Sequence, residues 1–186
     1  MRARHPALPT VWLMTDERMG DRLWPALDRL PRGAGVVFRH HATSAGERKR
    51  LMNRVHAVVR RRRLVLVVAG AGHGVGAGTH NGRGRGLRTR SAHSRVEALA
   101  AVRAGADAVF VSPVFATRSH PGARALGTVR LGMMIRDLPV PAIALGGVTK
   151  ARARSLVALG VHGWAAIDAW CEPAKSRYQK RNAVPT

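Results

Sequence analysis

The sequence predicts an α/β fold, a compact (β/α)8 TIM barrel with shortened or missing helices around the third and fourth strands. Apolar runs alternate along the chain with segments of helical periodicity, a pattern typical of parallel strands joined by helices. Two runs, in "GADAVFVSP" and "PVPAIALGGV", end in small residues, and barrel active sites form at such strand ends. The 186 residues fall at the lower limit for this fold, about 200 residues. An open doubly wound sheet is the alternative.

Eight segments are predicted to be strands, and most of them are short apolar runs. They are residues 11–14, 36–38, 64–68, 78–80, 87–92, 108–111, 142–145 and 163–167. The fourth is brief because it lies in "AGAGHGVGAGTHNGRGRG", where glycine predominates. Glycine there indicates either a flexible segment or a close approach of the backbone to a bound molecule. This region can hold a short helix at most.

Helical periodicity fills the gaps between the early strands. Apolar residues recur at helical spacing over 21–30, which predicts a first short helix. A second helix begins at Thr43 or Ser44, either of which can cap it, with Glu47 in the first turn. Four arginines at 60–63 close that helix, where their charge faces the negative end of the helix dipole.

The helices of the second half have clear ends. In "SRVEALAAVRAG", Ser94 and Glu97 form a capping box and Gly105 ends the helix. Further helices are expected around 129–137 and over 150–159, the last one followed by a glycine. Each of these helices leads into a predicted strand, as a repeated β–α unit requires.

The composition fits one globular domain over residues 1–186, with 172–186 as a basic C-terminal tail. No apolar run reaches the length of a membrane span, and no apolar signal core follows the basic N-terminus. Cys171 is the single cysteine. It rules out an internal disulfide and favours a reducing cytoplasm.

The net charge is +22, from 32 Lys and Arg against 10 Asp and Glu. Nucleic-acid binding, attraction of anionic small substrates and an arginine-rich bias without function are three interpretations. No zinc-finger, basic-zipper or aromatic RNA-binding signature accompanies the charge. We therefore favour compositional bias together with attraction of small anions over nucleic acid.

Three motifs occur in a fixed order: "SAHS" at 91–94, "PVFAT" at 113–117 and "LGGV" at 145–148. Around them, residues 87–170 resemble the second half of thiamine phosphate synthases and of TenI-like thiazole tautomerases, and residues 10–82 resemble them loosely. The resemblance implies a barrel transferase that joins an aminopyrimidine diphosphate to a thiazole phosphate and releases pyrophosphate with Mg²⁺. The implied partners are therefore phosphorylated pyrimidine and thiazole molecules.

The resemblance and the strand ends together give the candidate site residues. The catalytic candidates are His93, Ser91 and Arg39. The candidates for binding substrate or phosphate are Thr117, Ser119, His120, Gly146, Gly147, Ile167, Arg83 and Arg85. No residue is assigned as a metal ligand.

Each class of candidate has a chemical reason. Hydroxyls in the 112–127 loop can donate to anionic oxygens, and His120 stands where the family often has Lys. The glycine pair lets backbone amides approach a phosphate. An imidazole at His93 can act as acid and base, or it can order the strand end by hydrogen bonding. His40, His41 and His80 are expected near the same mouth.

Two features depart from the family pattern. A carboxylate at Asp168, where the family tends to carry a small or hydroxyl residue, would repel a phosphate unless protonated or paired with a cation. Where the synthases carry Asn-Asp after the third strand, with the Asp on Mg²⁺, this chain has Ala69-Gly70. No equivalent of their second metal-binding Asp occurs in 81–86, although Mg²⁺ prefers oxygen ligands. Either metal dependence is lost, or Arg83 and Arg85 neutralise the diphosphate.

The leading interpretation is a thiamine phosphate synthase-like enzyme. A TenI-like thiazole tautomerase is the first alternative, because it needs no magnesium carboxylates. A barrel that binds a phosphorylated ligand or RNA without turnover is the second, since fold resemblance alone does not carry function. The oligomeric state stays open.

Overall fold

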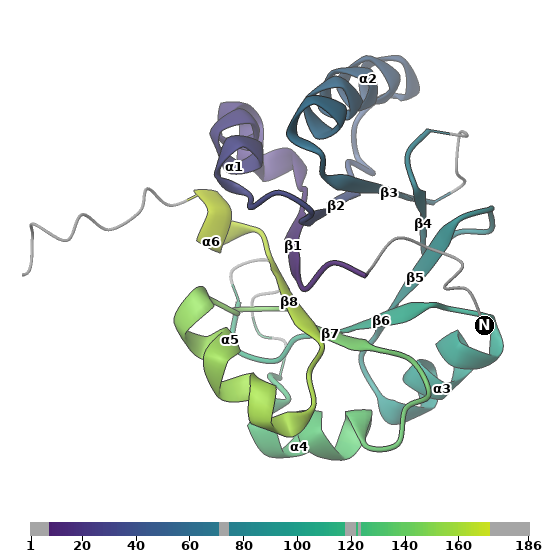
Figure 1. Ribbon diagram of the computed structural model, residues 1–186, viewed down its shortest axis with the longest axis vertical. Helices are drawn as coiled ribbons and strands as arrows, with labels where there is room; N and C mark the ends of the chain where they lie inside the picture. Colours follow the sequence, from purple (N-terminus) through teal and green to yellow (C-terminus); the bar gives the residue numbers. More distant parts are fainter. Residues whose placement is uncertain (1–7, 71–74, 118–121, 123, 172–186) are drawn as a thin grey trace, which may run out of the picture.

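The computed structural model describes residues 8–70, 75–117, 122 and 124–171 (Figure 1). Eight parallel strands form a closed barrel in sequence order. The strands are β1 (Val11–Met14), β2 (Gly35–Phe38), β3 (Val65–Ala69), β4 (Gly78–His80), β5 (Leu87–Ala92), β6 (Ala108–Val111), β7 (Ala142–Ala144) and β8 (Gly163–Ala166). Pairing of β1 with β8, with Leu13 beside Ala166, closes the barrel. The predicted barrel is confirmed, and the open sheet is wrong.

Helices connect most of the strands. They are the 3-10 helix η1 (Glu17–Arg22), α1 (Leu23–Arg29), α2 (Ala45–Arg62), α3 (Arg95–Arg103), α4 (Gly127–Ile135), α5 (Lys150–Leu156), the 3-10 helix η2 (Val157–Leu159) and α6 (Asp168–Cys171). Ser44 caps α2, and Ser94 caps α3 by accepting a 3.2 Å hydrogen bond from the Glu97 amide. The sequence signals of helix beginnings therefore hold in the folded chain.

One side of the barrel is covered by no helix of the described residues. Residues 81–86, which join β4 to β5, contain no helix, and neither do the described residues between β3 and β4. In Figure 1 this side lies between α2 and α3. A parallel connection usually takes a dozen residues or more, and here glycines shorten it: Gly86 has φ +82, and a Cβ there would overlap the Ala77 carbonyl oxygen. The expected loss of helices around the third and fourth strands is confirmed.

The barrel interior is filled by large side chains that meet small ones. Trp12 is fully buried, and its ring packs edge-on against Phe110 with 5.3 Å between centroids. Gly35 stands beside Trp12 in the neighbouring strand, and a Cβ at Gly35 would overlap the indole. The bottom of the barrel is thus a packed core, as in other barrels of this kind. This leaves the carboxyl ends of the strands, which we call the mouth, as the place for a site.

Among the described residues, no helix is long and apolar enough to cross a membrane. The predicted basic tail, 172–186, lies outside the described residues.

Candidate functional site

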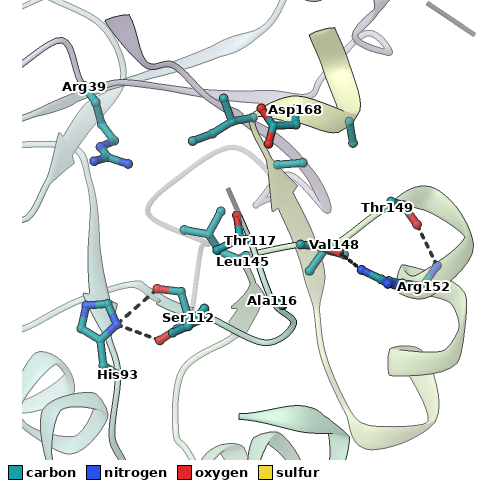
Figure 2. A pocket seen from close by; sticks show the side chains of 16 residues that line it. Arg39, His93, Ser112, Ala116, Thr117, Leu145, Val148, Thr149, Arg152 and Asp168 are labelled. Carbon is teal, nitrogen blue, oxygen red and sulfur yellow. Dashed lines mark hydrogen bonds between the residues drawn. The ribbon is translucent and has the colours of Figure 1, made fainter. Parts of the chain in front are cut away.

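A pocket of about 370 Å³ opens at the mouth, over the ends of β6, β7 and β8 (Figure 2). It is lined by Arg39, His93, Ser112, Pro113, Ala116, Thr117, Leu145, Gly146, Gly147, Val148, Thr149, Arg152, Ala166, Ile167, Asp168 and Ala169. Most of these side chains are small or apolar, and a few polar groups converge among them. That is the usual composition of a small-molecule site.

The loops that follow β6 and β7 are bound to each other. The Val114 amide donates to the Leu145 carbonyl at 2.9 Å, and the Phe115 amide donates to the Gly146 carbonyl at 3.0 Å. Gly146 and Gly147 have φ of +91 and +60. A Cβ at Gly146 would lie 2.8 Å from the Pro113 Cα, and one at Gly147 would overlap the Ala116 carbonyl oxygen. Only glycine fits both the backbone angle and the space, so the glycine pair first serves loop packing.

Arg152 holds this glycine turn in place. Its Nη1 donates to the Gly147 carbonyl at 2.7 Å, and its guanidinium lies 4.8 Å from the centre of the Phe115 ring. Its own amide donates to Thr149 Oγ1 at 3.3 Å, at the start of α5. Sequence reasoning missed Arg152, although its place five residues after the glycine pair was the available signal.

His93 stands at the edge of the pocket with one defined tautomer. Its Nδ1 lies 2.7 Å from the Ser112 carbonyl oxygen, and a carbonyl only accepts. Nδ1 therefore carries the proton, and Nε2 is the nitrogen with a lone pair in the neutral ring. The His93 amide donates to Glu97 at 2.9 Å, which fixes the residue to the start of α3. Figure 2 shows the imidazole bound to Ser112 beside the pocket.

Two charged residues line the pocket from distant parts of the chain. Arg39 follows β2; its amide donates to Thr15 Oγ1 at 3.1 Å, and its Nη1 lies 3.5 Å from the Met14 sulfur. Asp168 begins α6, directly after β8. Together with the exposed Arg152, the pocket lining therefore carries two cations and one anion, and Arg39 and Asp168 are half-buried.

Ser91 lies outside the pocket lining and belongs to a hydrogen-bonded group below the mouth. Its Oγ is 3.0 Å from His80 Nε2, and its amide donates to Asn81 Oδ1 at 2.8 Å. The other ring nitrogen of His80 is 2.9 Å from Thr89 Oγ1. Burial lowers the pKa of His80 to about 3, so its ring is neutral near neutral pH.

The other expected histidines do not join the pocket lining. His40 is buried, with Nδ1 at 3.0 Å from Thr15 Oγ1, and burial lowers its pKa. His80 is buried as well, whereas His41 is exposed but stands apart from the pocket. His40 and His80 therefore lie at the ends of β2 and β4, but their side chains are held in buried hydrogen bonds and do not line the pocket.

The phosphate-binding candidates divide into three groups. Thr117, Gly146, Gly147 and Ile167 meet in the one pocket. Arg83 and Arg85 are exposed on the connection between β4 and β5 and do not line it. Ser119 and His120 lie outside the described residues.

The described residues do not fit a Mg²⁺ site. No group of three or more His, Cys, Asp or Glu side chains is arranged to hold a metal ion within the described ranges. At the expected positions, Ala69 and Gly70 offer no side-chain oxygen, and Asn81 Oδ1 accepts from Ser91. Mg²⁺ needs several oxygen ligands in octahedral geometry, and these described residues do not supply them.

Comparison with a family model finds a likeness over most of this pocket. The model for thiamine monophosphate synthase matches residues 87–170, less than half of the chain. This matched part carries most of the pocket lining. His93, Ser112, Thr117, the glycine pair and Asp168 all lie within it, whereas Arg39 lies outside.

Curated thiamine-phosphate synthases match the same half of the chain. The protein of Chloroflexus aurantiacus is 40% identical over 80 residues, 42% of this chain and 37% of its own length. That of Pyrococcus furiosus is 37% identical over 79 residues, 42% and 38% of the two chains. That of Geobacillus kaustophilus is 37% identical over 81 residues, again 42% and 37%. The match thus spans about two fifths of these relatives.

A solved structure supports the fold over most of the chain. The thiamine phosphate pyrophosphorylase from Pyrococcus furiosus superposes with a TM-score of 0.71, covering 86% of each chain at 22% identity. At that identity the likeness establishes the barrel alone. The likeness in fold therefore extends into the first half of the chain, where the sequence match does not.

Proposed function

We propose that the chain is an enzyme acting on the phosphorylated thiazole of thiamine biosynthesis, the substrate that synthases and tautomerases of this family share. The observation that carries the proposal is the pocket in which Thr117, the glycine pair and His93 meet. These residues belong to three segments of the sequence and come together only at the mouth. A cytoplasmic enzyme of one domain, as the composition predicts, is part of this proposal.

The phosphate end of such a ligand has defined donors. The Gly146–Gly147 turn brings backbone within reach of the pocket, Thr117 adds a hydroxyl, and Arg39 adds a guanidinium. Charge-assisted hydrogen bonds of this kind are about twice as strong as neutral ones. The ring end packs against Leu145, Val148 and other apolar side chains, which exclude water from it. Asp168 borders this lining, and we place the phosphate away from its carboxylate.

Proton transfer at His93 is the chemistry that the geometry supports best. Nε2 takes a proton from one carbon of the thiazole precursor and returns a proton to another, so that the isomerisation is balanced. The hydrogen bond from Nδ1 to the Ser112 carbonyl stabilises the imidazolium formed between the two transfers. No diphosphate and no metal ion take part in this reaction, which suits the residues present.

Coupling to an aminopyrimidine diphosphate is the second candidate. The relatives that match residues 87–170 include several named thiamine-phosphate synthases, and this favours transferase activity. In that reaction the bond from the pyrimidine methylene to the diphosphate breaks, the thiazole nitrogen attacks the same carbon, and pyrophosphate leaves. Catalysis then depends on charge around the leaving group.

One experiment separates these activities. The protein is incubated with the phosphorylated thiazole precursor, alone and with the aminopyrimidine diphosphate, in EDTA and in Mg²⁺. Isomerisation without coupling supports the tautomerase, and thiamine phosphate supports the synthase. Neither product, together with a salt-sensitive nucleic-acid complex, would contradict the proposal and favour a non-catalytic barrel. The His93→Gln variant is the control for proton transfer.

A further inference from the structure

The mouth has a sector, over the ends of β3 and β4, whose own strands and connections carry no carboxylate. No Asp or Glu occurs between Glu47 and Glu97, a range that includes β3, β4, β5 and both of their connections. The same range carries many arginines, among them Arg48 and Arg90. A divalent cation placed there would meet positive charge and no anionic ligand.

The backbone oxygens of this sector are already bound by a cation of the chain itself. Arg48 Nε donates to the His40 carbonyl at 3.0 Å, and Arg48 Nη2 donates to the Ala69 carbonyl at 2.9 Å. The guanidinium also lies 5.2 Å from the centre of the Phe38 ring. It thereby joins the ends of β2 and β3. A metal ion could reach these carbonyls only by displacing the guanidinium from its charge-assisted contacts.

At the ends of β4 and β5, too, polar groups are already bound by side chains of the protein itself. His80, Thr89, Ser91 and Asn81 satisfy one another, with Asn81 Oδ1 accepting the Ser91 amide at 2.8 Å. His80 is 2% exposed. These polar groups close the interior below the mouth, and their donors and acceptors are directed to each other. Among these described residues, the side-chain oxygen atoms are already hydrogen-bonded to one another's groups. They are not arranged to bind a metal ion that could in turn bind a diphosphate.

The remaining space is small. The pocket of about 370 Å³ lies near the lower end of the usual range for small-molecule sites, about 300–1,000 Å³. A pocket of that size suits one phosphorylated ring molecule better than two bound together.

We infer that the mouth binds one monophosphorylated ring molecule at a time and that binding requires no divalent cation. This rests on the proposed function for the identity of the ring and on the sector over the ends of β3 and β4 for the rest. Arg48 and His80, from the first half of the chain, occupy the ends of β3 and β4, near the position where the synthases carry a magnesium-binding Asp. The pocket lies over the ends of β6, β7 and β8.

Calorimetric titration of the full chain tests the metal part of this inference. Inorganic phosphate is titrated in EDTA and again in Mg²⁺, and inorganic pyrophosphate likewise, with correction for the magnesium complexes in solution. We expect both affinities to stay within about twofold when Mg²⁺ replaces EDTA. Tightening of pyrophosphate binding by about tenfold or more, which is 1.4 kcal/mol, would show a metal-bridged site and overturn the inference.

Competition tests the single-ligand part. Thiazole phosphate and pyrophosphate are expected to displace each other, and independent binding of both would overturn the inference. If phosphate binds without Mg²⁺ but thiazole phosphate does not bind at all, the proposed function fails while the metal-free site stands. If phosphate does not bind under either condition, both fail.

Two matched arginine variants distinguish phosphate binding in the pocket from general attraction of phosphate by the net charge. Arg39→Gln removes a cation that lines the pocket, and Arg60→Gln removes an exposed one on α2. Losing a charged hydrogen bond costs about 1.5–3 kcal/mol, so we expect Arg39→Gln to weaken phosphate binding by about tenfold or more. Arg60→Gln should leave it unchanged. Equal losses in the two variants would mean diffuse attraction and overturn the site.

Discussion

Replacing Gly147 with alanine tests whether the loops that follow β6 and β7 are in close contact. A left-handed backbone costs a non-glycine residue about 1–2 kcal/mol, and Gly147 has φ +60. The new Cβ would also overlap the Ala116 carbonyl oxygen and lie 2.9 Å from the Phe115 Cβ. Overpacking of this kind costs a further 1–3 kcal/mol or so. We expect the free energy of unfolding to fall by about 2–5 kcal/mol.

Gly160→Ala is the matched control. Gly160 has φ +82, and no atom lies within 4 Å of the position that a Cβ would take there. Alanine at this position therefore meets only the backbone cost of about 1–2 kcal/mol. Urea unfolding and thermal unfolding, both followed by circular dichroism, measure the two variants. For a chain of this size, each kcal/mol lowers Tm by about 2–4 °C, so Gly147→Ala should melt clearly below Gly160→Ala. Equal destabilisation would refute the close approach of the two loops.

Three further predictions concern single side chains. His93→Gln should lower thiazole isomerisation by about 10²–10⁴-fold while phosphate affinity by calorimetry stays unchanged; a normal rate would exclude His93 as the acid–base group. Arg152→Lys keeps the charge but loses the planar contact with Gly147 and Phe115, so KM should rise about tenfold with kcat little changed, and a fall in kcat alone would contradict a positioning role. His80 is neutral in the folded chain because burial lowers its pKa to about 3, whereas the unfolded chain binds a proton below about pH 6.5. Its contribution to stability is therefore complete above about pH 6.5 and falls by about 1.4 kcal/mol per pH unit between about pH 6.5 and 3. Urea unfolding across that range should show a shallower slope for His80→Gln, and identical slopes would contradict the buried neutral ring.

Local signals predicted much of this fold. Ser94 and Glu97 marked the start of α3 correctly because a capping box involves only neighbours in sequence. The brief strand at 78–80 was found within a glycine-rich segment. The ends of β6 and β7 were predicted because apolar runs stop there at Ser112 and at the glycine pair.

Contacts between distant segments were beyond the sequence. Ser91 was expected at the active site, but its partner His80 lies across a strand pair whose register no local pattern fixes. Arg48 and Arg152 were missed because, among 32 Lys and Arg, no single arginine stands out by composition. Each acquires its role through carbonyl oxygens that only the closed barrel brings near it.

The two halves of the barrel therefore differ in their charged residues as well as in the helices that cover them. Residues 87–170 match the family model and carry most of the pocket lining, whereas the stretch from Arg48 to Gly86 carries cations, the buried His80 and no Asp or Glu. A net charge of +22 raises the local concentration of phosphorylated molecules by its long-range field. Such a field favours binding of a monophosphate. Release of pyrophosphate needs more, because positive charge must be fixed beside the oxygen atoms of the leaving group. Arg39 is the guanidinium that the structure brings from the first half into the pocket lining. The distribution of charge thus favours proton transfer on a captured monophosphate over release of pyrophosphate.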